Sequence, residues 1–274
     1  MKLTLGNQNI EAISVGGWET CIGFPAWKLC FDIGHCPLFS TKFPKVFFTH
    51  CHSDHMGGVQ MHCATRELKR MTPTEYWLPR PKEQDLKDLF SVWRRLNGSD
   101  LECAIHPLDV GDVVPLDNSK EIHTFQNYHT TPSLGYALVS KKQQLLPELR
   151  DFSSNVIRDL RLKGVTVTQE IKEVEAVFCG DTAIDVLDQP LVRQAKVLIL
   201  EVTFLEYERV TAEGARKHGH IHIDHILERA SDLQNQHILF THFSSRYTRE
   251  EVIKHFQNKL PQDLEKRVTL LLPE

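Results

Sequence analysis

An apolar run leads directly into four metal-ligand side chains in Val46-Phe47-Phe48-Thr49-His50-Cys51-His52-Ser53-Asp54-His55. Residues two apart on an extended strand point the same way, so His50 and His52 can bind one ion together. Ser53 is a favourable N-cap residue, so we expect Asp54 and His55 to open a helix and turn toward a second position. Imidazole and carboxylate ligands without an obligatory thiolate suit zinc, with manganese or iron as alternatives. A polar strand-to-helix loop is the structural alternative, and the density of the pattern argues against it.

Four further strand-like segments each run into a residue suited to metal binding or proton transfer. They are Ile122–Tyr128 before His129, Ala176–Cys179 before Gly180-Asp181, Val197–Leu200 before Glu201, and His237–Thr241 before His242. If these strands share one packed core, their C-terminal ends can meet at one edge, where a rigid scaffold usually positions functional loops. A single histidine or aspartate at a strand end is more often structural. Several of them, joined to the opening motif, predict one site.

The order of these residues resembles the binuclear metal set of the metallo-β-lactamase superfamily, and Phe31-Asp32-Ile33-Gly34 matches its early Asp-x-Gly turn. More specific motifs resemble tRNase Z, the tRNA 3′-processing endoribonuclease, in its short form. They are His129-Thr-Thr-Pro-Ser-Leu-Gly-Tyr136, Gly180-Asp181-Thr182, Glu201-Val202-Thr203-Phe204, Gly219-His220 and Thr241-His242-Phe243-Ser244-Ser245-Arg246-Tyr247. The resemblance covers nearly the whole chain.

The resemblance implies a site with two zinc ions and a hydrolytic mechanism that leaves a 3′-hydroxyl and a 5′-phosphate. One ion would be held by His50, His52 and His129 and the other by Asp54, His55 and His242, with Asp181 bridging them. Asp54 would also orient the attacking hydroxide. His220 would protonate the leaving oxygen, with Glu201 holding its imidazole. Substrate contacts are expected from Arg246 and Tyr247. The neighbouring His218, His222 and His225 are expected to be supporting or surface residues.

The alternation of segments predicts an α/β fold: a metallo-β-lactamase-type αββα sandwich of two mixed β-sheets flanked by helices, as a single domain over residues 1–274. Expected strands are Ile10–Val15, Thr20–Phe24, Lys28–Asp32, Val46–Thr49, Glu75–Leu78, Val113–Leu116, Ile122–Asn127, Gly135–Val139, Val174–Cys179, Val197–Glu201, His237–Thr241 and Val268–Leu272. Expected helices are Gly58–Arg70, Lys82–Leu96, Phe152–Lys163, Thr211–Lys217, Ile223–Leu233 and Arg249–Lys259.

The stretch from Lys141 to Glu173 is the least core-like part of the sequence. It falls where the tRNase Z family places an arm that holds the tRNA, but it is short and lacks that arm's Gly-Pro-rich signature. We expect a small excursion, a reduced arm at about residues 141–173, whose cations Arg158, Arg161 and Lys163 contact the body of a tRNA. Shielding a sheet edge or assisting a dimer is the structural alternative.

Composition indicates an intracellular enzyme, expected in the cytoplasm. No apolar run approaches the roughly 20 residues that span a membrane. The seven cysteines are scattered and odd in number, which favours reduced thiols in a reducing compartment. Cys51, within the metal motif, is expected to be a buried small side chain rather than a ligand.

The net charge of −4 opposes a nucleic-acid partner unless positive charge is local. Two local groups of cations are available, and each could equally be a solvated helix face. They are Arg66, Lys69 and Arg70, and Lys82, Lys87, Arg94 and Arg95. From the resemblance we expect a tRNA precursor as the partner, and a homodimer.

Three functional classes follow. The first is a tRNA 3′-end endonuclease. The second is a metallo-β-lactamase-fold hydrolase of a small phosphodiester, sulfate ester, thioester or lactone. The third is a metal-binding protein without catalysis, which the complete ligand set disfavours. Glu201, His220 and the Arg246-Tyr247 pair favour the first class over the second, because thioesterases and lactonases need no such acid.

Overall fold

Two mixed β-sheets form the centre of the molecule, seen here in a computed structural model that describes residues 1–206 and 210–272. In this part of the chain each sheet has seven strands. The first sheet runs in chain order through β1 (Lys2–Leu5), β2 (Gln8–Val15), β3 (Glu19–Phe24), β4 (Leu29–Phe31), β5 (Lys45–Phe47), β6 (Thr74–Pro79) and β7 (Cys103–Leu108). The second runs through β8 (Val113–Pro115), β9 (Lys120–Gln126), β10 (Leu134–Leu145), β11 (Thr168–Phe178), β12 (Val197–Glu201), β13 (His237–Thr241) and β14 (Val268–Leu270).

Both sheets share one design, an antiparallel half followed by a parallel half. Pairing is antiparallel from β1 to β4 and parallel from β4 to β7. It is likewise antiparallel from β8 to β11 and parallel from β11 to β14. Parallel neighbours place their carboxyl ends at the same edge, so the residues that follow β11, β12 and β13 leave the second sheet together.

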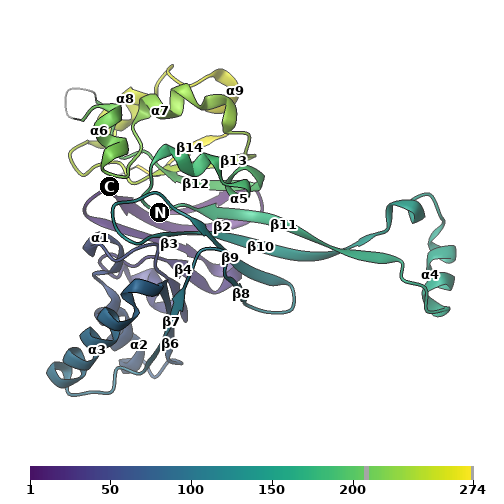
Figure 1. Cartoon of the computed structure of the whole chain (residues 1–274), viewed down its shortest axis with the longest axis horizontal. Coiled ribbons are helices and arrows are strands. Elements are labelled where there is room, and N and C mark those ends of the chain that lie inside the picture. The colour runs from purple at the N-terminus through teal and green to yellow at the C-terminus, as the bar shows by residue number, and fades with distance from the viewer. Residues whose placement is uncertain (207–209, 273–274) are drawn as a thin grey trace.

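The described helices cover the outer face of each sheet, apart from α4 (Ser154–Leu162), which lies at the tip of a projecting ribbon (Figure 1). They are α1 (Ser53–Met56), α2 (Val59–Leu68), α3 (Glu83–Asn97), α4 (Ser154–Leu162), α5 (Pro190–Gln194), α6 (Ala212–Lys217), α7 (Ile223–Glu228), α8 (Arg249–Phe256) and α9 (Gln262–Glu265). Val59 of α2 and Phe90 of α3 pack with Val46 and Tyr76 of the first sheet. This arrangement is the expected αββα sandwich.

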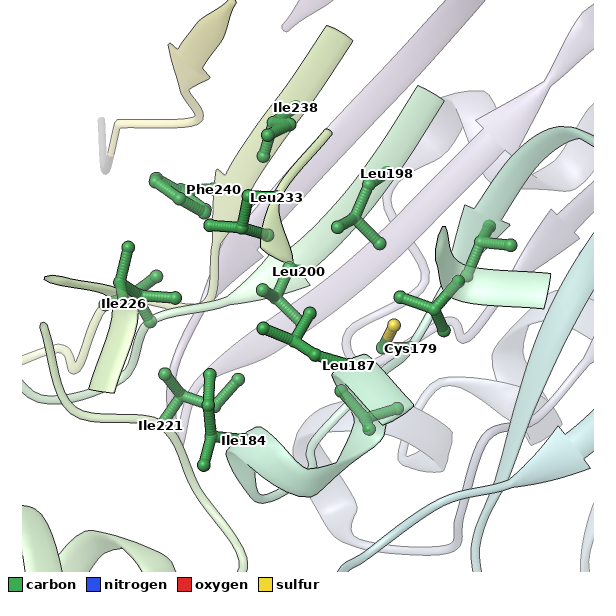
Figure 2. Close-up of a cluster of buried hydrophobic side chains, with 14 of the residues drawn as sticks. Cys179, Ile184, Leu187, Leu198, Leu200, Ile221, Ile226, Leu233, Ile238 and Phe240 are labelled. Atoms are coloured by element: carbon green, nitrogen blue, oxygen red, sulfur yellow. The ribbon is translucent and has the colours of Figure 1, made fainter. Parts of the chain in front are cut away.

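The core has an inner layer between the sheets and an outer layer beneath each set of helices. In the inner layer the ring of Phe31 stacks on Tyr136 and Phe178 of the other sheet, with centroids 5.4 and 5.5 Å apart. Strand β12 is buried on both faces. Ile199 joins the inner cluster, while Leu198 and Leu200 join Ile226 of α7 in the outer one (Figure 2). Such two-sided burial explains why this strand is an unbroken apolar run.

A long two-stranded ribbon, formed by the outer parts of β10 and β11, projects from the second sheet and carries α4 at its tip (Figure 1). We call the segment from Lys141 to Lys172 the arm. Its strands pair as far as Leu145 and Thr168. The sequence predicts strand only to Val139 and from Val174, so the ribbon exceeds the small excursion expected. Its strand residues are mostly polar and none of them is buried, so they lack the alternation of buried apolar and exposed polar side chains that marks a strand.

Several shorter elements also differ from expectation. Strands β1 and β7 were not predicted. Both lie at edges of the first sheet, where Pro107 is tolerated inside β7 because an edge strand needs fewer hydrogen-bond donors. Helices α5 and α9 have only five and four residues, too few for a periodic pattern. The helix expected over Ile223–Leu233 ends at Glu228, and α1 begins at Ser53 with His52, not Ser53, as its N-cap.

Candidate metal centre

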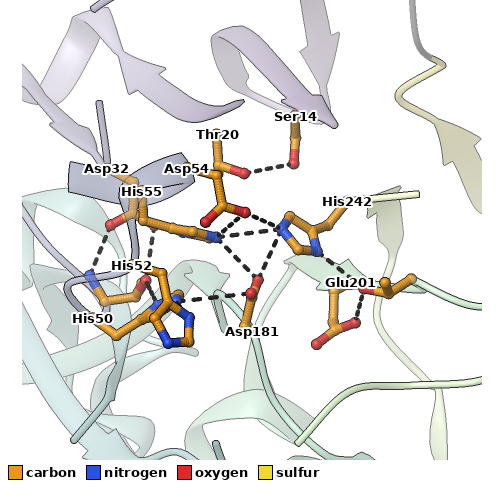
Figure 3. Close-up of polar contacts among 12 residues, drawn as sticks. Ser14, Thr20, Asp32, His50, His52, Asp54, His55, Asp181, Glu201 and His242 are labelled. Carbon is orange, nitrogen blue, oxygen red and sulfur yellow. Dashed lines mark hydrogen bonds and ion pairs between the residues drawn. The ribbon is translucent and has the colours of Figure 1, made fainter. Parts of the chain in front are cut away.

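The loops after β5, β9, β11 and β13 bring the seven predicted ligands into two groups at one edge of the sandwich. Figure 3 labels these ligands apart from His129. One group contains His50, His52, His129 and Asp181. The other contains Asp54, His55, Asp181 and His242. Within each group the candidate ligand atoms all lie within 4.8 Å of one another.

Asp181 joins the two groups through separate oxygens. Its Oδ2 lies 3.8 Å from Nε2 of His50, whereas its Oδ1 lies 3.3 Å from Nε2 of His55 and 3.2 Å from Nε2 of His242. Burial raises the pKa of Asp181, but the imidazoles of His242 and His55 outweigh burial and hold that pKa well below its usual range. Oδ1 is buried and receives no hydrogen bond from any described residue. A divalent cation would satisfy this oxygen.

Four of the histidines are oriented by a contact at Nδ1. His55 Nδ1 donates to Asp32 Oδ2 at 2.8 Å, and His129 Nδ1 donates to the carbonyl of Gly219 at 2.9 Å. His50 Nδ1 lies 3.1 Å from the Thr49 hydroxyl, and His242 Nδ1 lies 3.0 Å from the Thr203 hydroxyl. A proton held on Nδ1 leaves the Nε2 lone pair for a metal, which is how ligating histidines are usually supported.

Two glycines allow these contacts to form. Gly180, with φ of +63°, precedes Asp181, and a Cβ there would lie 2.7 Å from the Thr49 side chain. Gly219, with φ of +70°, precedes His220, and a Cβ there would lie 2.8 Å from the His129 ring. Both positions need the left-handed conformation and close approach that glycine permits. This is the physical basis of the Gly-Asp and Gly-His motifs.

Asp32 and Thr203 support the site in roles that the sequence did not reveal. Asp32 is fully buried and accepts hydrogen bonds from the Thr49 N–H, the Thr49 hydroxyl and His55. Thr203 donates its hydroxyl to Glu201 and accepts from His242. Asp32 and Thr203 both belong to motifs quoted in the sequence analysis. Their residue types and spacing, however, do not indicate which histidines they contact.

Glu201 and His220 form a pair beside the two metal groups. His220 Nδ1 donates to Glu201 Oε1 at 2.9 Å. Glu201 also accepts from the backbone N–H groups of Thr182 and Ile221. Glu201 lies near His220 and His242. Because its carboxylate oxygens already accept these hydrogen bonds, it is suited to orient His220 rather than to hold a metal. Burial lowers the pKa of His220, but the Glu201 carboxylate outweighs burial and raises it to about 9.

A cavity of about 410 Å³ opens onto this arrangement. Its lining includes Asp54, Asp181 and His242 of the metal groups, together with His220 and Arg246. A second cavity, also about 410 Å³, reaches His129 and is bordered by Pro79 and the loop around Pro132. The centre is therefore accessible to a ligand that extends past it on more than one side.

Other expected site residues lie elsewhere. Tyr247 was expected to contact substrate, but it is 4% exposed and its hydroxyl accepts from the backbone N–H groups of Leu205 and Glu206. It supports the loop after β12. Cys51, which was expected to be a buried side chain and not a ligand, is only partly buried. It packs beside the cluster of Val46 and Phe48, and burial raises the pKa of its thiol to about 12.

The three further histidines near His220 separate into surface and structural residues. His218 is exposed. His222 is the N-cap of α7 and accepts from the Asp224 N–H, while His225 Nδ1 accepts from the His222 N–H. Two imidazoles thus cap one short helix.

The candidate RNA-binding cations fall into different environments. Arg158, Arg161 and Lys163 are exposed on or next to α4, at the tip of the arm and far from the metal groups (Figure 1). Arg158 lies 3.7 Å from the Asp159 carboxylate, and on α3 Lys87 forms a closer ion pair with Glu83 at 2.6 Å. Arg66 is buried and donates to the carbonyls of Thr41 and Thr72, so both alternatives considered for it, an RNA contact and a solvated helix face, are wrong.

Comparison with known proteins agrees with this geometry. Residues 40–243 match the family model described as beta-lactamase superfamily domain. The chain is 39% identical to tRNase Z TRZ1 of Arabidopsis thaliana, over 96% of this chain and 94% of that protein. It is 37% identical to the chloroplastic tRNase Z TRZ2 of the same plant, over 89% of this chain and 69% of that protein.

Solved structures show the same fold. The short form of human tRNase Z superposes with a TM-score of 0.60 at 18% identity, over 86% of this chain and 93% of that one. The metallo-beta-lactamase fold protein YhfI of Bacillus subtilis superposes with a TM-score of 0.64 at 12% identity, over 95% of this chain and 94% of that one. The solved structures show the fold, and the family model together with the curated relatives shows that the chain belongs to the tRNase Z family of the β-lactamase superfamily.

Proposed function

We propose that this protein is a divalent-metal-dependent endoribonuclease that removes the 3′ trailer from tRNA precursors. The observation that carries the proposal is that His220, held by Glu201, lines the same cavity as residues of both candidate metal groups. Family membership supports tRNA as the substrate. A proton donor beside a metal cluster is what hydrolysis of an alkyl phosphodiester needs, because its alkoxide leaves poorly without protonation.

The donor set fits two ions of zinc type. His50, His52 and His129 would hold one, Asp54, His55 and His242 the other, and Asp181 would bridge them. The unsatisfied Oδ1 of Asp181 and the Nδ1 contacts of the histidines support this assignment. When bound, such ions supply Lewis acidity and activation of a water molecule. Manganese or iron would suit the same nitrogen and oxygen ligands.

Side chains around the cavity are suited to orient the attacking oxygen, to protonate the leaving group and to bind a phosphate. Asp54 Oδ2 accepts from the Gly17 N–H at 3.0 Å, and this contact fixes the carboxylate where it can orient the attacking oxygen. His220, held by Glu201, donates a proton to the departing ribose 3′-oxygen. Arg246 lies at the cavity and is suited to a backbone phosphate of the RNA. The products would be a 3′-hydroxyl and a 5′-phosphate.

A comparison of two substrates tests this function. The purified protein should release the trailer from a tRNA precursor and should also hydrolyse bis(p-nitrophenyl) phosphate. Cleavage of the small ester alone would instead place the protein among hydrolases of small phosphodiesters or related esters, the second class considered above.

Replacing Asp32 by alanine is expected to weaken metal binding about 10- to 100-fold, the usual cost of losing a group that orients a ligating histidine. His55 would lose its Nδ1 acceptor, and Thr49 would lose both of its contacts to Asp32. Zinc titration of the metal-free protein measures the effect. Asp100→Ala, which removes an exposed carboxylate, is the control. Equal affinities of the two variants would contradict the role of Asp32.

We also propose that the arm binds the body of the tRNA through Arg158, Arg161 and Lys163. Replacing all three by glutamine should weaken pre-tRNA binding and flatten its salt dependence, because phosphate contacts release counterions. Hydrolysis of bis(p-nitrophenyl) phosphate should stay unchanged. The matched control replaces Lys82, Lys87 and Arg95 of the α3 region, where Lys82 and Lys87 already have carboxylate partners. If only the control variant loses affinity, α3 is the RNA-binding surface.

The assembly and compartment stay predictions. A homodimer, implied by the family resemblance, would be measured by sedimentation.

None of the helices in residues 1–206 and 210–272 combines the length and apolar character that a membrane span requires. All seven cysteines are free, which fits the reducing cytoplasmic environment expected. The relatives include a chloroplastic and a nuclear enzyme, so localisation needs direct imaging.

A further inference from the structure

We call the place where β10 and β11 leave the neighbouring strands β9 and β12 the root of the arm. Pairing of β9 with β10 extends to Lys120 and Ser140, and pairing of β12 with β11 begins at Val197 and Ala176. Just beyond these pairs, the Lys141 N–H donates to the Ser119 carbonyl at 2.7 Å and the Lys196 N–H donates to the Val174 carbonyl at 3.0 Å. Farther out, β10 and β11 pair only with each other in the described part of the chain. A two-stranded ribbon alone is marginally stable and has no sheet to fix its direction. Other contacts must set the angle at which it leaves the body.

A β-bulge lies at this root, and its extra residue is a buried carboxylate. Leu138 pairs with Ala176 and Val139 pairs with Val174, so Glu175 is the additional residue. Bulges bend a strand and increase its twist, which redirects the ribbon here. Glu175 is 3% exposed. A charge buried to that degree requires specific partners.

The partners of Glu175 come from both the ribbon and the body. The Ser140 hydroxyl donates to it at 2.5 Å, and the ammonium groups of Lys142 and Lys196 each lie 3.1 Å from it. Both lysines also contact Glu173 at 2.5 Å. Lys196 belongs to the segment before β12, not to the ribbon. It therefore ties the ribbon to the body of the protein.

A second ion-pair cluster holds the opposite face. Glu121 of β9 lies 3.0 Å from Lys141 and 2.8 Å from Lys172, which are directly paired across the ribbon. Hydrogen bonds from Lys172 and His123 lower the pKa of Glu121 to about 2, so it is ionised at neutral pH. Lys141 and Lys142 are adjacent, and adjacent side chains on a strand point to opposite faces. The two clusters thus brace the ribbon from both sides.

We propose that Glu121, Glu175 and Lys196 are positioning residues that hold the arm at one angle to the body. This role rests on the proposed function, because it matters only if RNA bound at α4 must present its scissile phosphodiester at the metal centre. Helix α4 lies at the far end of a long ribbon (Figure 1). A small rotation at the root therefore moves the tip by a large distance, while the metal centre stays intact.

Two variants of Lys196 test the proposal in the whole metal-loaded chain. Lys196→Met removes the charge that ties the ribbon to the body, and Lys196→Arg keeps it. When the arm is no longer held at one angle, binding at the arm assists binding at the metal centre less, so KM for pre-tRNA should rise roughly tenfold or more in Lys196→Met. We expect parent-like KM in Lys196→Arg. Hydrolysis of bis(p-nitrophenyl) phosphate and kcat on pre-tRNA should change little. Lys266→Met, which removes an exposed lysine from the body, is the control.

A distance measurement tests the arm angle without RNA. Spin labels carried by unnatural amino acids at the exposed Thr166 and Glu213 would report the separation of arm and body without using the native cysteines. Lys196→Met should broaden the distribution of label distances, and Lys196→Arg should not. Parent-like KM or an unchanged distribution in Lys196→Met would overturn the proposal. If the parent protein fails to cleave pre-tRNA, the proposed function fails and the RNA-positioning role fails with it, even where the label distances change.

Discussion

Asp181→Ala is expected to lose metal from both groups at once and to have little phosphodiesterase activity. One carboxylate oxygen faces His50, and the other lies between His55 and His242, so no other described side chain is shared by the two groups. Undenatured parent protein should contain about two ions per chain, as binuclear hydrolases do. The variant should contain less than one. Loss of a group that only supports a ligand already lowers metal affinity or activity about 10- to 100-fold. Loss of the bridging ligand itself should therefore reduce activity by more than ~10²-fold.

His50→Ala is the comparison that isolates the bridging role. It removes a ligand from one group only, so it should empty mainly that group and leave an ion near Asp54, His55 and His242. Metal analysis after gel filtration in chelator-free buffer distinguishes the two variants, and circular dichroism checks that both are folded. If Asp181→Ala keeps two ions per chain, or His50→Ala loses both, the assignment of Asp181 as a bridge is wrong.

The positions of the candidate ligands could be foreseen because they combine two local signals. Each is a residue type that binds metal, and each follows a strand whose apolar run is readable in the sequence. His129, Asp181 and His242 are far apart in the chain, but parallel and antiparallel pairing brings the ends of their strands to one edge. The family motifs then predicted the pairing of Glu201 with His220, which the structure places 2.9 Å apart.

The groups that orient these residues could not be foreseen, because their contacts are made by the folded chain rather than by sequence spacing. The acceptor for His129 is a backbone carbonyl 90 residues away. Arg66 and Tyr247 looked like surface contacts for RNA, yet both are buried and hydrogen-bonded to backbone. The arm was underestimated for a related reason. Its strands bury neither face, and the ion pairs of Glu121 and Glu175 that brace it join residues distant in the sequence.

His220→Ala is expected to keep both metal ions and to lose most activity on RNA. His220 lines the cavity but belongs to neither of the two groups joined by Asp181. Without it the ribose 3′-oxygen must leave without a proton from the protein, and proton transfer typically contributes roughly 10²–10⁴-fold. We expect a loss of that size in single-turnover cleavage of pre-tRNA, with metal content unchanged.

The size of the loss should depend on the leaving group, which a merely structural role would not produce. p-Nitrophenolate departs readily without protonation, so His220→Ala should be much less impaired on bis(p-nitrophenyl) phosphate than on pre-tRNA. Glu201→Gln should show the same dependence more weakly, because it would disturb the orientation of His220 without removing the imidazole. His218→Ala, which removes an exposed histidine two residues away, is the matched control and should resemble the parent. Equal losses on the RNA and the activated ester would exclude His220 as the proton donor, and the donor would then have to be sought among other groups that line the cavity.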